Sequence, residues 1–297
     1  TLSLHDALPI WNRAKPWLNQ AASEASGRPF AVEGDLSASW HWPQPLEEGW
    51  HRWVPGVTVQ GTQLVLQDPP GFVRPGKSAE PRPTASAEVA RASLKLWPLL
   101  AREVVIDTLE LSGPDISLAR LRDGTNNWTL PPKDLADTKT RWTFSVHQLV
   151  VRKGRLGYAD ATQDLDLTAR VDTLPEDTAM APPHAAASSA ASADVASGSP
   201  RYGVRFDVMG TLGKARIEGH GKAGSVLTLR DKQVNYPLQF TAKAGSVETA
   251  VQGILANPGA LSGMDFQVIL KGASMADLYS LTGLVLPNTP AFQTQGW

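Results

Sequence analysis

The sequence predicts a mainly β protein: an elongated, curved antiparallel sheet that leaves a groove open, with an N-terminal helix and few short helices. Apolar and polar residues alternate along most of the chain, as they do in strands with one apolar and one wet face. The 25 glycines and 23 prolines punctuate these segments where turns are expected. Only two segments show helical spacing, too few to cover so many strands, so part of the apolar face is expected to stay open.

The clearer of the two helices is expected over Trp11–Ser26. Its apolar residues return at helical spacing, Pro16 falls near its start and Gly27 follows its end. Basic and aromatic side chains near its start suit a segment close to a bilayer, so we predict a membrane-proximal set: Trp11, Arg13, Lys15 and Trp17. The second helix is expected over Ser274–Leu281, with Ser274 as its N-cap.

The strongest strand signal lies between Ala90 and Trp128. Val104–Leu111 and Ile116–Leu121 alternate in hydrophobicity, and Gly113-Pro114 between them is a turn signal. The same apolar pattern returns 40 residues later, at position 146 for position 106, with Gly154 at its turn. We interpret the region as repeated hairpins that extend one sheet. Their apolar rows are predicted to line the groove: Ile106, Leu109, Leu111, Ile116, Leu118, Val146, Leu149, Val151, Leu156 and Tyr158.

Other strands are expected within Phe30–Leu66, at Leu165–Val171 and through Tyr202–Gly272, where the glycines are interpreted as turns or bulges. A loop rich in tryptophan and proline interrupts the first of these segments. Asp68–Thr84, rich in proline and glycine, is predicted to be an exposed loop. The Ala-, Ser- and Pro-rich segment 175–200 has little to bury and is predicted to be a disordered insertion.

Composition excludes several classes of function. A net charge of −1 argues against a nucleic-acid partner, because phosphate binding needs clustered Lys and Arg. The absence of cysteine excludes thiol catalysis, disulfides and cysteine-bound zinc, and it fits an oxidising compartment. Asp160, Asp164 and Asp166 lack the glycine and closing glutamate of a calcium loop, and no nucleophile-elbow motif is present. We therefore predict no catalytic residue, metal or cofactor.

Residues 1–10, TLSLHDALPI, match a conceptual translation of a sequencing adapter, and we exclude them from the fold prediction. The sequence does not begin with methionine. We therefore expect residues 11–297 to be one β-groove domain that is part of a longer protein.

Several motifs in this order resemble the AsmA family of bacterial envelope proteins. They are Trp11-Asn12-Arg13, Glu24–Phe30, Gly34-Asp35-Leu36, Leu94–Leu100, Val105-Ile106, Leu109–Leu111, Gly113–Leu118, Asp123–Trp128, Gly154-Arg155-Leu156, Tyr158 and Leu286–Phe292. AsmA-like proteins are similar to bridge-like lipid-transfer proteins. The resemblance implies a membrane-spanning anchor before Trp11, an inner-membrane location with most of the chain in the periplasm, and phospholipid or another acyl-chain ligand as partner.

The resulting hypothesis is a non-enzymatic protein of outer-membrane biogenesis that holds or conducts phospholipid along a hydrophobic β-groove. Two alternatives remain at this point. One is a scaffold or regulator of outer-membrane protein assembly with a closed core and no lipid. The other is a polysaccharide-binding β protein, because exposed tryptophans can stack on sugars.

Overall fold

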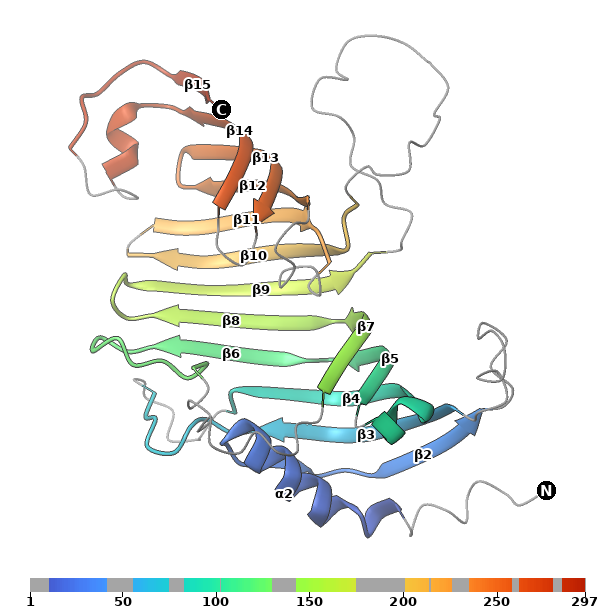
Figure 1. The fold of residues 1–297 in the computed structure, drawn as a ribbon. Helices are drawn as coiled ribbons and strands as arrows, with labels where there is room; N and C mark the ends of the chain where they lie inside the picture. The colour runs from blue at the N-terminus through green and yellow to red at the C-terminus, as the bar shows by residue number, and fades with distance from the viewer. Residues whose placement is uncertain are drawn as a thin grey trace, which may run out of the picture. The chain divides into compact units, whose positions relative to one another are not determined.

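The computed structural model describes residues 11–41, 56–74, 83–101, 103–129, 143–174, 201–213, 215–225, 235–257, 262–279 and 285–296. The predicted fold class is confirmed: within these residues fifteen strands form one sheet, mostly antiparallel and not closed (Figure 1). The chain divides into two compact units, Thr1–Gly157 and Tyr158–Trp297. Residues 1–10, the tryptophan-rich segment 42–55 and the segment 175–200 lie outside the described residues.

The first unit contains the helix α2 (Lys15–Ser26), the 3₁₀ helix η3 (Trp97–Ala101) and the first seven strands. These strands are β1 (Phe30–Val32), β2 (Leu36–His41), β3 (Gly56–Leu66), β4 (Ala85–Lys95), β5 (Glu103–Ser112), β6 (Asp115–Arg120) and β7 (Thr143–Arg152). Strand β8 (Gly154–Asp160) spans the boundary between the units.

The second unit is an antiparallel meander in which each strand pairs with the next along the chain. Its strands are β9 (Leu165–Thr173), β10 (Val204–Leu212), β11 (Ala215–Ala223), β12 (Tyr236–Ala244), β13 (Val247–Asn257), β14 (Ser262–Gly272) and β15 (Phe292–Gly296). The short 3₁₀ helix η7 (Met275–Leu278) follows β14, and Ser274 caps it as predicted by accepting a hydrogen bond from the Ala276 N–H.

Helix α2 begins at Lys15, later than predicted, and ends as predicted at Gly27, whose φ of 65° makes it a left-handed C-cap. Two asparagines, Asn19 within α2 and Asn12 just before it, bind this segment to the edge of the sheet. The Asn12 side chain accepts a hydrogen bond from the Leu36 N–H at 3.0 Å, and the Asn19 side chain accepts one from the Val32 N–H at 3.0 Å. The helix therefore covers backbone donors of β1 and β2 that would otherwise be exposed at a sheet edge.

The predicted hairpin at Gly113-Pro114 is wrong. Strand β4 pairs antiparallel with β5 through Val89–Lys95 and with β6 through Ala85 and Ser86, so β5 and β6 run in the same direction. The chain bends there because Gly113 adopts a φ of 59°, a conformation that favours glycine. Lys153, its counterpart in the repeat, has a φ of 54°. Each repeat is thus one bent strand and not a hairpin.

The repeat itself is real and has a structural meaning. Strands β5 and β7 pair in parallel, and residues 40 apart stand opposite one another, as Thr108 and Gln148 do through a side-chain hydrogen bond. Beyond the bends, β6 and β8 are neighbours in the sheet. The 40-residue period detected in the sequence is therefore the register of these two parallel strands.

Several glycines expected at turns instead lie inside strands, opposite large side chains. Gly221 faces Phe206 on one neighbouring strand and Phe240 on the other, and a Cβ at Gly221 would approach the Phe206 ring to 2.7 Å. Gly253 faces Phe266 in the same way, at 2.6 Å. Gly210 and Gly219 also belong to strands. Their role is to make room for the neighbouring chains, because only glycine permits such a close approach.

Candidate functional site

The first unit carries an apolar face formed by cross-strand rows of β2, β3, β4, β5 and β7. Residues that stand directly opposite in neighbouring strands point to the same side of a sheet, so the registers define the rows. One row is Trp40, Val57, Leu94, Ile106 and Val146; the next is Ala38, Val59, Ala92, Leu109 and Leu149; the third is Leu36, Gly61, Ala90, Leu111 and Val151. We call these residues the first apolar face.

A bulge keeps this face apolar. The register between β4 and β5 shifts between Ser93 and Leu94, which leaves Asp107 without a partner in the ladder. The shift returns Ile106 to the side that holds Leu109 and Leu111. Asp107 itself lies 3.7 Å from the Lys95 ammonium and 3.5 Å from the His147 imidazole. The bulge therefore separates a charged cluster from the apolar rows.

Six of the ten predicted groove residues belong to the first apolar face, and they meet in pairs: Ile106 with Val146, Leu109 with Leu149, and Leu111 with Val151. The other four lie beyond the bends, in β6 and β8. Ile116 is 37% exposed, and Leu118, Leu156 and Tyr158 are half-buried. The rows of the first apolar face do not include these four residues. The Tyr158 hydroxyl donates to the Asp160 carboxylate at 3.1 Å.

The second unit carries a larger apolar face of the same kind, which we call the second apolar face. The registers of β9 to β14 place the following side chains on one side: Leu165, Leu167, Ala169, Val171, Val204, Phe206, Val208, Leu212, Ala215, Ile217, Ala223, Tyr236, Leu238, Phe240, Ala242, Ala244, Val247, Val251, Leu255, Met264, Phe266, Val268 and Leu270. The sequence prediction identified most of these positions as strand but did not include them in the groove. Their alternation was the signal that could have done so.

The opposite side of the same strands is charged. It holds Asp166, Arg170, Asp172, Arg205, Asp207, Arg216, Glu218, His220, Lys222, Lys243, Glu248, Asp265 and Lys271. Among the paired positions of β9 to β14 that the structure describes, none of these charged residues shares a side with the second apolar face. The charged side chains thus lie on one side of the layer, where only a few apolar ones, such as Met209, Ile254 and Ile269, accompany them.

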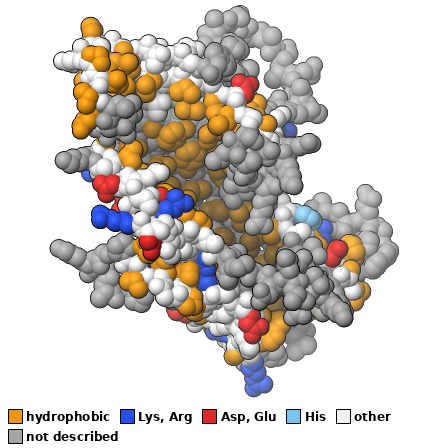
Figure 2. All heavy atoms as spheres, turned by 60° about the vertical axis from the view of Figure 1, so that its left-hand side comes forward, with side chains coloured by type: hydrophobic (Ala, Val, Ile, Leu, Met, Phe, Trp, Pro, Cys, Tyr) orange, Lys and Arg blue, Asp and Glu red, His pale blue; other side chains and the backbone are white. Residues whose placement is uncertain are grey.

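The second apolar face is only partly buried. Val204, Ala223, Tyr236 and Leu255 form a small core, and burial raises the pKa of Tyr236 to about 12. The Phe206 and Phe240 rings stack beside it with centroids 5.8 Å apart. By contrast, Val268 is 38% exposed and Met264 is 65% exposed. Figure 2 shows hydrophobic side chains gathered over a hollowed surface at the height of these strands.

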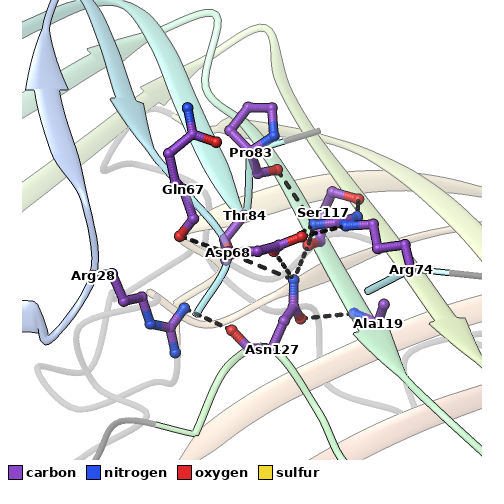
Figure 3. A network of polar contacts seen from close by, with 9 residues as sticks. All are labelled: Arg28, Gln67, Asp68, Arg74, Pro83, Thr84, Ser117, Ala119 and Asn127. Carbon is purple, nitrogen blue, oxygen red and sulfur yellow. Dashed lines mark hydrogen bonds and ion pairs between the residues drawn. The ribbon is translucent and has the colours of Figure 1, made fainter. Parts of the chain in front are cut away.

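A buried polar network ties together segments of the first unit that are far apart in sequence (Figure 3). Arg74 donates to both oxygens of Asp68, at 2.7 and 2.9 Å. Thr84 and Asn127 donate to Asp68 Oδ1 at 2.6 and 2.8 Å. Arg28, 4% exposed, donates to the Asn127 carbonyl at 2.6 Å. Asp68, Arg74 and Thr84 are therefore anchored in the interior, where the prediction of an exposed loop is wrong. Between them Pro70, Gly71 and Val73 are exposed, as predicted.

Asn127 is at the centre of this network and is fully buried. Its side-chain amide donates to the Ser117 carbonyl at 2.8 Å, and its side-chain oxygen accepts from the Ala119 N–H at 2.8 Å. Asn127 thereby pairs with the backbone of β6 next to the short stretch where β4 pairs with that strand. The network is a structural support for the bent sheet, which it ties to the segments that hold Arg28, Asp68 and Arg74.

The acid stability of the protein is expected to depend on Asp68. Burial raises the pKa of its carboxyl, but hydrogen bonds from Arg74, Asn127 and Thr84 and the Arg74 charge outweigh burial and bring the pKa below its usual 3.8. A carboxyl with a lowered pKa stabilises the fold above the unfolded-state pKa, and this contribution is lost as pH falls through the folded-state pKa. The melting temperature should therefore fall below about pH 4 more steeply in the native protein than in Asp68→Asn. Parallel profiles would contradict this role.

No calcium site is predicted at Asp160, Asp164 and Asp166. The structure places these three carboxylates in separate environments. Asp160 is 2% exposed and accepts from the Thr162 N–H and hydroxyl at 2.9 and 2.5 Å, which makes it a turn residue. Asp164 lies in the turn with a φ of 52°, and Asp166 is an exposed residue of β9, so the two do not lie on one strand. Within the described ranges no three His, Asp or Glu side chains stand close enough to hold a metal ion.

The predicted membrane-proximal residues lie at the start of the N-terminal helical segment. Trp17 is 72% exposed and Arg13 is exposed, whereas Trp11 and Lys15 are half-buried. In the part of the chain that the structure describes, no helix has the length and apolarity needed to span a bilayer.

Comparisons with known proteins place the sequence among known relatives. The AsmA family model matches residues 7–297. The chain is 31% identical to the AsmA family protein YhjG of Escherichia coli K12, over 96% of this chain and 41% of that protein. The chain thus spans less than half the length of this relative. No solved structure matches the chain significantly.

Proposed function

The chain belongs to the AsmA family of bacterial envelope proteins, and from this membership we propose that it holds or conducts phospholipid on its apolar sheet faces without catalysing a reaction. The observation that carries the proposal is the second apolar face. It is a single layer of hydrophobic side chains, only part of it buried, which is backed by charged residues and formed by strands β9 to β14. A sheet face of this kind needs an apolar cover, and acyl chains supply one.

The energetics favour an acyl chain as the cover. Burying an acyl chain of about sixteen carbons gains on the order of 12 kcal/mol at about 0.8 kcal/mol per methylene. Hydrophobic contact is non-directional, so a continuous apolar surface retains a chain without fixing its position along the surface. The phosphate headgroup can remain in water meanwhile. These properties suit transport better than a pocket with directional hydrogen bonds would.

We also propose that the protein acts in the periplasm, held at the inner membrane, in the biogenesis of the outer membrane. The family relationship supports an envelope role, and the lack of cysteine is compatible with an oxidising compartment. The exposed Trp17 and Arg13 near the start of α2 are the kinds of residues found close to a bilayer surface.

Photocrosslinking tests the proposal face by face. Met264 and Asp265 are consecutive, both exposed, and point to opposite sides of β14. A benzophenone amino acid at position 264 should crosslink to phospholipid during expression in a bacterial host, whereas the same residue at position 265 should not. Mass spectrometry of the labelled peptides measures the adducts. Equal crosslinking at the two positions, or none at either, would contradict lipid binding on the second apolar face.

A further inference from the structure

One end of the first unit exposes large apolar side chains. Strands β2 and β4 end there, β3 and β5 begin there, and η3 connects β4 to β5 at the same place (Figure 1). Trp40 of β2 is 61% exposed. In η3, Leu100 is 91% exposed and Trp97 is 36% exposed. We call Trp40, Trp97 and Leu100 the tryptophan end.

The tryptophan end is continuous with the first apolar face. Trp40 is the outermost member of the row that passes through Val57, Leu94, Ile106 and Val146. Lys95 and Val105 are the last paired residues of β4 and β5 on that side, and η3 lies between them in the chain. The apolar rows therefore run to this end of the sheet and stop at a surface that is itself apolar.

The residue types indicate what this surface contacts. Tryptophan has an apolar ring system with one polar N–H, and it is enriched where hydrocarbon meets water at membrane interfaces. A leucine exposed to 91% on a short helix is costly in water and inserts readily between lipid chains. A protein partner would need a complementary pocket, whereas a bilayer surface accepts such side chains without a fixed shape.

We propose that the tryptophan end contacts the surface of a phospholipid bilayer, so that lipid enters or leaves the first apolar face at the row that contains Trp40. This inference rests on the proposed lipid-binding function and adds the place and the partner for lipid exchange. It requires that Leu100 become buried in the membrane when the protein meets a vesicle.

The chain contains no cysteine, so a single introduced cysteine carries a unique probe. Leu100→Cys and Val73→Cys are a matched pair, because Val73 is 76% exposed and follows β3 at the opposite end of the same unit. Each variant is labelled with an environment-sensitive fluorophore and titrated with vesicles of phosphatidylethanolamine and phosphatidylglycerol. The probe at position 100 should shift to the blue and gain intensity, and the probe at position 73 should not respond. Equal responses, or none at position 100, would overturn the inference.

A second variant gives the size of the effect. Trp40→Ser combined with Leu100→Ser should lower vesicle affinity about tenfold or more in a flotation assay, with Val73→Ser unchanged. Extraction of co-purifying phospholipid from the same samples separates the two proposals. A protein that carries lipid but shows no response at position 100 overturns the membrane contact alone. A protein without lipid that does respond contradicts the proposed function and supports the contact.

Discussion

Replacing Asn127 by alanine should lower the free energy of unfolding by about 3–5 kcal/mol, among the largest losses expected for a single substitution in this chain. The side chain is fully buried, and it serves the Asp68 carboxylate, the Ser117 carbonyl and the Ala119 N–H. Alanine leaves the buried Ala119 N–H without a partner, and an unsatisfied buried polar group costs about 1–3 kcal/mol. It also removes one hydrogen bond each from the Asp68 carboxylate and the Ser117 carbonyl, which Arg74 still contacts, at about 1 kcal/mol apiece. Urea denaturation followed by circular dichroism measures the loss.

The neighbouring Asn126 is the control. Its side-chain oxygen accepts from the Thr129 N–H at 2.8 Å and the Thr129 hydroxyl at 2.7 Å, but these bonds are exposed to solvent. Water can replace them, so Asn126→Ala should cost only about 1 kcal/mol. If the two asparagine variants lost equal stability, the network around Asp68 would not be the support that its geometry indicates.

The contacts of this network could not be predicted from the sequence. Arg28 and Asn127 are 99 residues apart, and Asp68 and Asn127 are 59 apart. Arg28 and Asn127 each belong to a motif identified in the sequence. Nothing in either motif indicates that the two side chains meet. Side chains that form one buried cluster from separate loops leave no periodic signal, in contrast to strands.

Strand positions were predictable because alternation is a local property. Ile106 and Val146 are corresponding positions of the 40-residue repeat in the sequence, and the structure pairs them across β5 and β7. The path of the chain was not predictable at the same place, because Gly113-Pro114 marks both a hairpin turn and a bend within a strand. Only the pairing of β4 with both β5 and β6 distinguishes the two.

The open apolar face was predicted in kind but only partly in extent. The small number of helical segments in the sequence predicts an uncovered sheet. Among its described residues the second unit contains one short helix, η7. Nine of the ten predicted groove residues belong to the first unit, where the repeat lies, and Tyr158 is the first residue of the second. Glycines such as Gly221 made the strands of the second apolar face harder to identify, because a glycine inside a strand resembles a turn signal in the sequence.

A negative charge on the second apolar face should remove bound lipid. Met264→Glu combined with Val268→Glu places two carboxylates among side chains that are 65% and 38% exposed, so the fold should tolerate them. An acyl chain lying on this face would have to desolvate both charges, at a cost of several kcal/mol. Lipid occupancy should therefore fall tenfold or more. Met209→Glu is the matched control, because Met209 is 48% exposed and lies on the charged side of β10.

Native mass spectrometry with lipid extraction, on the chain purified from a bacterial host, tests the central claim most directly. We expect phospholipid bound to the unaltered protein and to Met209→Glu, and little or none bound to the Met264→Glu, Val268→Glu double variant with the same circular dichroism spectrum. A folded, monodisperse protein that carries no lipid, or a double variant that keeps as much lipid as the control, would contradict a lipid-holding sheet face.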